Sequence, residues 1–84
     1  MKIITNYDFK VGGFYVIKAF ESGAKYKVKV TKVKADLIFG YYLYWLPAKK
    51  AFVKSTPSYH GAFDQISYVR KCKPFKVTEN ENVL

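Results

Sequence analysis

The sequence contains one cysteine, one histidine and one arginine, and it has few acidic residues. Cys72 has no partner for an internal disulfide, and a metal site would need ligands besides Cys72 and His60. The first residues, MKIITNYDF, lack the long apolar stretch of a signal peptide. The apolar run LIFGYYLYWL is too short to cross a membrane as a helix. We therefore expect a cytoplasmic protein, of a cell or of an infected host, with no cofactor and no metal ion.

The shortage of acidic residues leaves a strong positive charge. Fifteen basic residues stand against six acidic ones, which gives a net charge of +9. Such a balance is typical of nucleic-acid binders and also fits acidic protein partners. All of the basic residues except Arg70 are lysines. Because arginine reads guanine and phosphate in a bidentate manner, a charge dominated by lysine predicts attraction to a phosphate backbone with little sequence specificity.

The length and composition predict one small folded domain. A chain of 84 residues must draw its stability from one compact core, and half of its residues are hydrophobic. The aromatic share of 19% argues against disorder of the whole chain. We predict that residues 1–76 form the domain and that residues 77–84, which are acidic and polar, form a flexible tail.

The first half of the domain is predicted to be a β-hairpin after a turn at Gly12 and Gly13. Phe14–Phe20 is rich in aromatic and β-branched residues, and Tyr26 begins a second segment of the same kind. The loop between them contains Gly23, which suits a left-handed backbone conformation.

The second predicted strand, which runs through YKVKVTKVK, alternates valine and lysine and then slips by one residue. Val28 and Val30 share one face, yet the next apolar residue is Val33. One extra residue at Thr31-Lys32 restores the phase and returns Val33 and Ala35 to the core side, which is typical of a β-bulge. The bulge keeps every lysine of the strand on the outside, and it predicts a strongly bent strand.

Three further strands complete the prediction. Leu37–Leu46 is apolar on both faces, and Gly40 within it indicates a bend or a close backbone approach. Ala51–Ser55 is predicted as the fourth strand, and Thr56–Ala62 as a loop. Ile66–Arg70 is predicted as the fifth strand, with a short helical turn as the alternative for residues 63–73.

Five short, bent strands around one core predict an all-β fold, a small five-stranded and partly open barrel. The opening of the chain also resembles the Tudor-like members of the SH3-like barrel class, in which a Val-Gly turn leads into the first strand and a Tyr opens the second. The residues that carry this resemblance are Val11, Gly12, Gly23, Tyr26, Val30 and Val33. The resemblance implies an SH3-like (Tudor-like) barrel. It implies no ligand, because the acidic and asparagine positions that accompany the aromatic cage of that family are missing.

Catalysis has little support in the sequence. Cys72 lies between Lys71 and Lys73, which favour the thiolate, but no third group stands at a telling position to orient His60 as a base. We interpret Cys72 as a packing residue and His60 as a polar turn residue before Gly61. The acidic residues show no paired spacing, and no glycine-rich phosphate loop is present. We predict that the protein is not an enzyme.

Basic residues form the clearest candidate site, in three groups. One lies along the bulged strand, one around the turn between the third and fourth strands, and one near the end of the domain. The proposed binding residues among them are Lys27, Lys29, Lys32, Lys34, Lys49, Lys50, Lys54 and Arg70. Lysines on an outward strand face also prevent aggregation, which is the alternative interpretation. Three clusters of positively charged residues exceed what solubility requires, and this favours binding of a polyanion.

Aromatic side chains are the second part of the candidate site. Both faces of Leu37–Leu46 carry aromatics, and a small core cannot take both. We place Phe39, Leu43 and Trp45 in the core, while Tyr42 and Tyr44 are either packed or exposed for base stacking. Tyr59 is predicted to be exposed in its loop.

The sequence therefore predicts a module that binds nucleic acid with little sequence specificity through a surface of lysines and tyrosines. The alternative is a small protein-interaction module or inhibitor that docks on an acidic host protein, with tyrosines as anchors. The small size and the lysine-rich composition suit a phage-encoded protein in that case.

Overall fold

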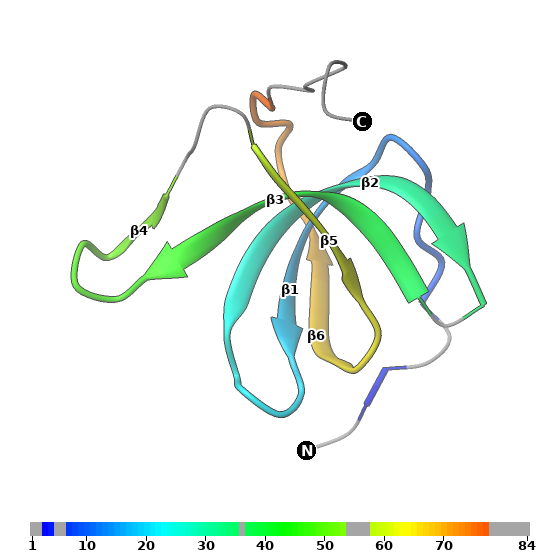
Figure 1. Ribbon diagram of the computed structural model, residues 1–84, viewed down its shortest axis with the longest axis horizontal. Coiled ribbons are helices and arrows are strands. Elements are labelled where there is room, and N and C mark those ends of the chain that lie inside the picture. The colour runs from blue at the N-terminus through cyan, green and yellow to red at the C-terminus, as the bar shows by residue number, and fades with distance from the viewer. Residues whose placement is uncertain (1–2, 5–6, 36, 54–57, 78–84) are drawn as a thin grey trace.

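The computed structural model describes residues 3–4, 7–35, 37–53 and 58–77, and it confirms the all-β prediction (Figure 1). Six strands lie within these residues, and all of their pairings are antiparallel. Their bounds are β1 Phe14–Ala19, β2 Lys25–Lys34, β3 Leu37–Leu46, β4 Ala51–Val53, β5 Tyr59–Phe63 and β6 Ile66–Lys71. No helix in the described part of the chain is long and apolar enough to cross a membrane.

The strands form one open sheet in the order β4-β3-β2-β1-β6, and β5 pairs with β3 beside β4. The long strand β3 therefore pairs with β2 along one edge and with both β5 and β4 along the other edge. Ile38–Tyr42 pairs with β5, and Tyr44–Leu46 pairs with β4. In Figure 1, β2 and β3 curve strongly, β5 crosses β3, and the β3–β4 hairpin extends away from β1 and β6.

Strand β5 corrects the prediction of five strands, because Tyr59–Phe63 falls largely within the predicted loop. Its central pair is Gly40 with Gly61. A Cβ atom at Gly40 would overlap the carbonyl oxygen of Lys29, and a Cβ atom at Gly61 would lie 3.1 Å from the ring of Tyr42. The close backbone approach predicted at Gly40 is therefore confirmed, and glycine is required there for steric reasons.

The predicted β-bulge is also confirmed. Val30 pairs with Gly40, and Lys32 pairs with Phe39, so Thr31 is the extra residue on β2. Beyond the bulge, Val33 is the partner of the buried Ile38, and it lies on the core side although it is 41% exposed. Ala35 follows the end of β2 and turns with a φ of 52°, and it lines a small pocket together with Val33 and Ile38, on the core side as predicted.

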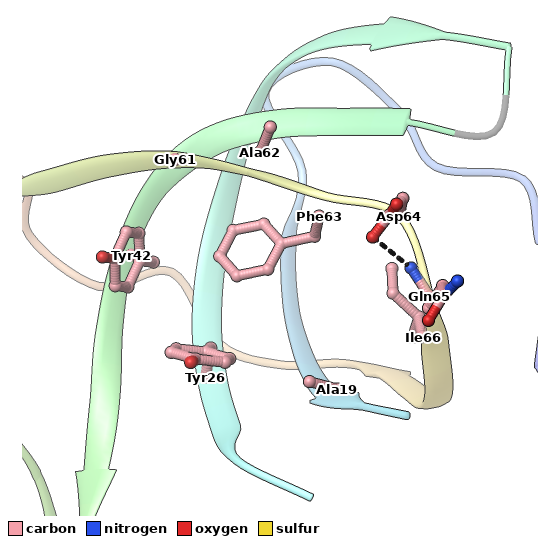
Figure 2. A pocket seen from close by; sticks show the side chains of 9 residues that line it. All are labelled: Ala19, Tyr26, Tyr42, Gly61, Ala62, Phe63, Asp64, Gln65 and Ile66. Atoms are coloured by element: carbon pink, nitrogen blue, oxygen red, sulfur yellow. Dashed lines mark hydrogen bonds between the residues drawn. The ribbon is translucent and has the colours of Figure 1, made fainter. Parts of the chain in front are cut away.

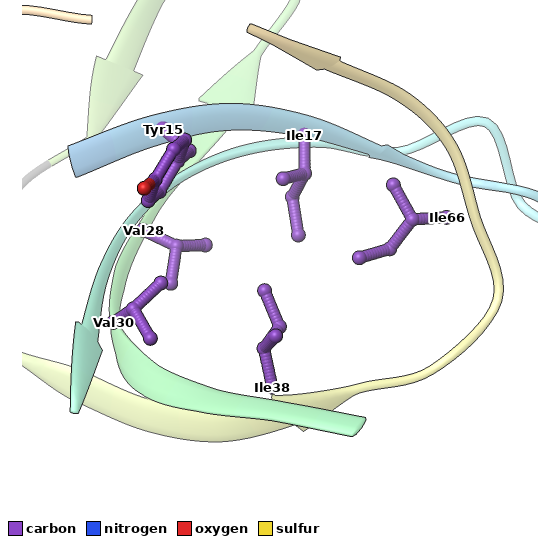
Figure 3. Packing of buried hydrophobic residues seen from close by; sticks show 6 residues of the cluster. All are labelled: Tyr15, Ile17, Val28, Val30, Ile38 and Ile66. Atoms are coloured by element: carbon purple, nitrogen blue, oxygen red, sulfur yellow. The ribbon is translucent and has the colours of Figure 1, made fainter. Parts of the chain in front are cut away.

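The core lies on one face of the curved sheet, here called the inner face. Its buried cluster consists of Tyr15, Ile17, Val28, Val30, Ile38 and Ile66, and Figure 3 shows these side chains converging. Each fully buried valine or isoleucine stabilises the fold by about 1.5–3 kcal/mol relative to an exposed one. The opposite face of the sheet, here called the outer face, carries the lysines of β2.

The segment before β1 closes one end of this core. The Tyr7 and Phe9 rings contact the Tyr15 ring at centroid distances of 5.9 Å and 5.0 Å. The predicted turn at Gly12 and Gly13 is present, with a φ of 87° at Gly12. The Gly12 N–H donates to the Val30 carbonyl and the Val30 N–H donates to the Gly13 carbonyl, so this turn is attached to β2. Gly23 has a φ of 70°, as predicted for the β1–β2 loop.

Candidate nucleic-acid interface

The outer face brings lysines and apolar side chains together across neighbouring strands. Lys27 is the partner of Leu43, Lys29 of Tyr41, and Lys32 of Phe39. Directly paired residues of antiparallel strands project from the same side of the sheet. The lysines of β2 therefore lie beside a row of β3 side chains. Their outward direction agrees with the prediction from the sequence.

Several of these lysines contact aromatic rings through their charged ends. The Nζ atom of Lys27 lies 4.7 Å from the centroid of the Phe52 ring, that of Lys25 lies 5.3 Å from Trp45, and that of Lys32 lies 5.5 Å from Phe39. These distances fall within the range of cation–π interactions, which contribute about 0.5–1 kcal/mol each at exposed sites. The outer face is thus a mixed surface of positive charge and aromatic rings.

A groove of about 560 Å³ crosses this surface, here called the outer groove. One wall carries Trp45 from β3 and Phe52 from β4, whose ring centroids lie 5.2 Å apart. The other wall carries Tyr68 and Arg70 from β6. The residues that line it are Val16, Lys18, Lys25, Trp45, Phe52, Ser67, Tyr68 and Arg70. The groove therefore joins three aromatic rings to three basic side chains.

The described lining of the outer groove carries no negative charge. None of the described residues that line it is acidic. Asp8 pairs with Lys10 at 2.8 Å in the segment before β1, and the Asp64 carboxylate accepts a hydrogen bond from the Gln65 N–H in the β5–β6 connection. The potential in the groove is consequently positive, and it favours an anionic ligand.

The predicted binding residues do not form one surface. The lysines 27, 29, 32 and 34 share the outer face, and of the predicted residues only Arg70 lines the outer groove. Lys49 and Lys50 are exposed in the β3–β4 turn, and Lys54 lies outside the described residues. Tyr42 and Tyr44 are the partners of Val28 and Tyr26, so they project from the inner face, opposite the lysines.

The inner-face tyrosines form a packed cluster instead. Figure 2 shows Tyr26, Tyr42 and Phe63 pointing toward one another from β2, β3 and β5. Their ring centroids lie 5.1–5.4 Å apart beside a pocket of about 300 Å³. Burial raises the pKa of Tyr42, with a further rise from the neighbouring tyrosines. The Tyr42 ring meets the other two edge to face, and the Tyr26 and Phe63 rings are tilted by 54°, so the three rings pack against one another.

Tyr59 extends this cluster to the surface. It lies 5.8 Å from Tyr42 and 6.0 Å from Tyr44 by ring centroids, at interplanar angles of 34° and 35°. The predicted exposure of Tyr59 is confirmed at 48%, but the residue belongs to β5 and not to a loop.

Sequence reasoning missed most of the outer groove. Phe39 and Trp45 were assigned to the core, but both are half-buried on the outer face, where Trp45 forms a wall of the groove. Phe52, Lys25 and Tyr68 were not identified as binding residues. The alternation within Leu37–Leu46 does place Trp45 on the face of Phe39 and Leu43, but only the register with β2 shows that this face also carries the lysines.

Cys72 is partly buried, and His60 packs against side chains of β2 and β3. Burial raises the pKa of the Cys72 thiol, and the charges of Lys27 and Arg70 oppose this rise only in part. The expectation that neighbouring lysines favour the thiolate is therefore wrong. His60 Nε2 lies 3.2 Å from Thr31 Oγ1, and the His60 ring meets Tyr41 edge-on at 4.8 Å. Within the described ranges, no three His, Cys, Asp or Glu side chains are grouped so that they could hold a metal ion.

Comparison of the chain with protein-family models, with curated proteins and with solved structures found no match.

Proposed function

We propose that the protein is a non-enzymatic module that binds nucleic acid through its outer face with little sequence specificity. The observation that carries this proposal is the outer groove, in which Lys18, Lys25 and Arg70 stand among three aromatic rings and no acidic residue. The net charge of +9 supports it, since such a charge attracts a polyanion from a distance. A cytoplasmic location belongs to the same proposal.

Phosphate contacts explain the expected behaviour. Each lysine that neutralises a phosphate releases condensed counterions, so affinity falls as salt rises, with a slope of about −0.7 per phosphate on a single strand. Lysine supplies a point charge and not a bidentate fork, and this gives little discrimination between bases. The surface is therefore suited to grip a backbone more than to read a sequence.

Fluorescence anisotropy of labelled oligonucleotides tests the proposal. Single-stranded and duplex probes are titrated with the whole chain at low and at near-physiological salt. We expect binding that weakens steeply with salt and varies little among sequences. Absence of binding at low salt, or affinity that does not depend on salt, would contradict the proposal.

The second candidate function is docking on an acidic protein, as an interaction module or a phage-encoded inhibitor. The Tyr44–Tyr59 pair favours it, because tyrosines anchor many protein interfaces and Tyr59 is 48% exposed. A pull-down after nuclease treatment distinguishes the two functions. Recovery of one acidic protein in stoichiometric amount would favour this second candidate.

For the fold, we infer an SH3-like (Tudor-like) small barrel with an added strand. The order β5-β3-β2-β1-β6 and the two-residue connection between β5 and β6 support this inference, with β4 as an addition on the edge of β3. The resemblance of the N-terminal half to Tudor-like domains supports the same assignment. An experimental structure that shows β5 and β6 closing one barrel wall would test it.

A further inference from the structure

We infer that the outer groove selects single-stranded nucleic acid by stacking an unpaired base on the Trp45–Phe52 wall. This inference rests on the proposed function and names the form of nucleic acid that the site takes. Lysines alone attract any polyanion. The aromatic wall adds a requirement that duplex DNA and simple polyanions do not meet.

The placement of the walls supports a strand-sized ligand. Trp45 on β3 and Tyr68 on β6 flank a floor made by β2 and β1, on which Val16 is 2% exposed. Neighbouring strands lie about 4.8 Å apart, so three spacings separate the walls by about 14 Å at the backbone. The groove therefore accommodates one nucleic-acid strand lying across β1 and β2.

The chemistry of the wall favours unpaired bases. In a duplex, each base face is covered by its neighbours in the stack, so no base face is free to stack on the Trp45 ring. In a single strand, a base can leave its neighbours and lie on an aromatic ring, which is the usual contact of sequence-tolerant single-strand binders. Trp45 offers such a ring, and Phe52 supports it edge-on at an interplanar angle of 69°.

The positive charges are placed to hold the phosphates of the same strand. Lys18 is the partner of both Lys25 and Tyr68, and Arg70 is the partner of Val16, so the three cations span the floor from β2 to β6. The ammonium group of Lys25 lies over the Trp45 ring. A base that stacks on this ring displaces Lys25 toward a flanking phosphate, so one cation–π contact is replaced by a stacking contact and an ion pair.

The other aromatics of the outer face are less suited to this role. Tyr41 packs against His60, with ring centroids 4.8 Å apart. Phe39 lies under the ammonium group of Lys32, and neither Phe39 nor Tyr41 lines the outer groove. Tyr41 therefore provides a matched control, because it lies on the same face of the same strand as Trp45 but outside the groove.

The single tryptophan of the chain makes the inference directly measurable. The intrinsic fluorescence of the whole protein is followed during titration with oligothymidylate DNA, oligouridylate RNA, a duplex of equal length, and heparin, which has charge but no bases. We expect saturable quenching with the two single strands. The duplex and heparin bind by charge and leave the emission of Trp45 nearly unchanged.

Variants extend the test by anisotropy. Trp45→Ala is expected to weaken single-strand binding by about 5- to 140-fold, the range that corresponds to the loss of one stacked base. Trp45→Phe is expected to retain most of the affinity, and Tyr41→Ala to change it by less than about threefold, which is below the effect of one stacked base. Heparin affinity is expected to be equal in all three variants.

The outcomes separate this inference from the proposed function. If no polyanion binds the protein at low salt, the proposed function fails and the inference fails with it. If single strands and heparin bind with salt dependence but Trp45 is not quenched and Trp45→Phe binds like Trp45→Ala, charge binding stands and base stacking is overturned. If Trp45→Ala does not fold, the fluorescence titration of the unaltered protein decides alone. Base stacking is then overturned if the duplex or heparin quenches Trp45 as strongly as the single strands do.

Discussion

The ammonium nitrogen of Lys27 on β2 lies 4.7 Å from the centroid of the Phe52 ring on β4, two strands away. The two side chains reach across β3, where Leu43, the partner of Lys27, is only 2% exposed. A surface lysine thus helps to bury an apolar residue on the outer face. This contact links the short strand β4 to the body of the sheet.

Replacement of Phe52 tests that link. Phe52→Ala removes the contacts of its ring with Trp45 and Lys27, and it is expected to lower the free energy of unfolding by about 1–2 kcal/mol. Phe52→Leu keeps an apolar cover over Leu43 and is expected to cost less. Urea denaturation followed by circular dichroism measures both. Equal stability of Phe52→Ala and the parent protein would contradict the role of β4 described here.

The pair Gly40 and Gly61 gives a prediction about sterics. Gly40→Ala places a methyl group against the Lys29 backbone, which cannot move without disturbing β2, and it is expected to destabilise the fold by about 3 kcal/mol. Gly61→Ala meets only the ring of Tyr42, at 3.1 Å, and is expected to cost about 1 kcal/mol or less. Thermal unfolding of the two variants compares them. A larger cost at Gly61 than at Gly40 would contradict the close approach of Gly40 to the backbone of β2.

Arg70 and Lys71 allow the two faces to be compared with one charge change. Both are exposed residues of β6, but Arg70 lines the outer groove, whereas Lys71 is the partner of Tyr15 on the inner face. Arg70→Gln is expected to weaken oligonucleotide binding and to reduce the salt slope by about 0.7, the value for one phosphate contact. Lys71→Gln is expected to change only long-range attraction. Identical slopes for the two variants would mean that total charge, and not the outer face, governs binding.

Cys72 is predicted to react slowly with a neutral alkylating reagent such as iodoacetamide. Its raised pKa, caused first by burial, means that the folded chain holds less thiolate than the unfolded chain at any pH between the two values. The associated stability is present below the ordinary pKa of the thiol and is lost as pH rises through the raised one. Alkylation followed by mass spectrometry is expected to be slower in the folded protein than in denaturant near pH 8.5.

Nucleic acid is expected to slow this alkylation further. Lys27 and Arg70 lower the pKa of Cys72, so phosphates that neutralise them leave burial unopposed. The Cys72 N–H donates to the Phe14 carbonyl at 3.0 Å, which places Cys72 beside the start of β1. Faster alkylation in the presence of a saturating oligonucleotide would contradict binding at this face.

The sequence allowed much of the sheet to be predicted because local signals were strong. The valine–lysine alternation with its single slip predicted both β2 and the bulge at Thr31. Gly23 and Gly12 predicted turns that have positive φ values. Strand β5 was missed because His60, Gly61 and Ala62 carry no strand pattern of their own. They are extended because they pair with β3, which is a contact between distant segments.

The candidate site was less accessible to sequence reasoning for the same reason. Alternation shows which residues of a strand share a face, but it does not show which faces of two strands coincide. The register of β2 with β3 places Trp45 with the lysines and places Tyr42 and Tyr44 on the other side. The participation of Phe52 and Tyr68 depends in turn on β4 and β6 lying at opposite edges of the main strand order.

The most direct test of the account is the salt dependence of single-strand binding, measured for the parent protein and for a variant with Lys27, Lys29, Lys32 and Lys34 all changed to glutamate. We expect a steep negative slope of log affinity against log salt for the parent, and loss of most of that affinity in a variant that remains folded by circular dichroism. A folded variant that binds as tightly as the parent, with the same slope, would contradict the claim that the outer face holds the nucleic acid.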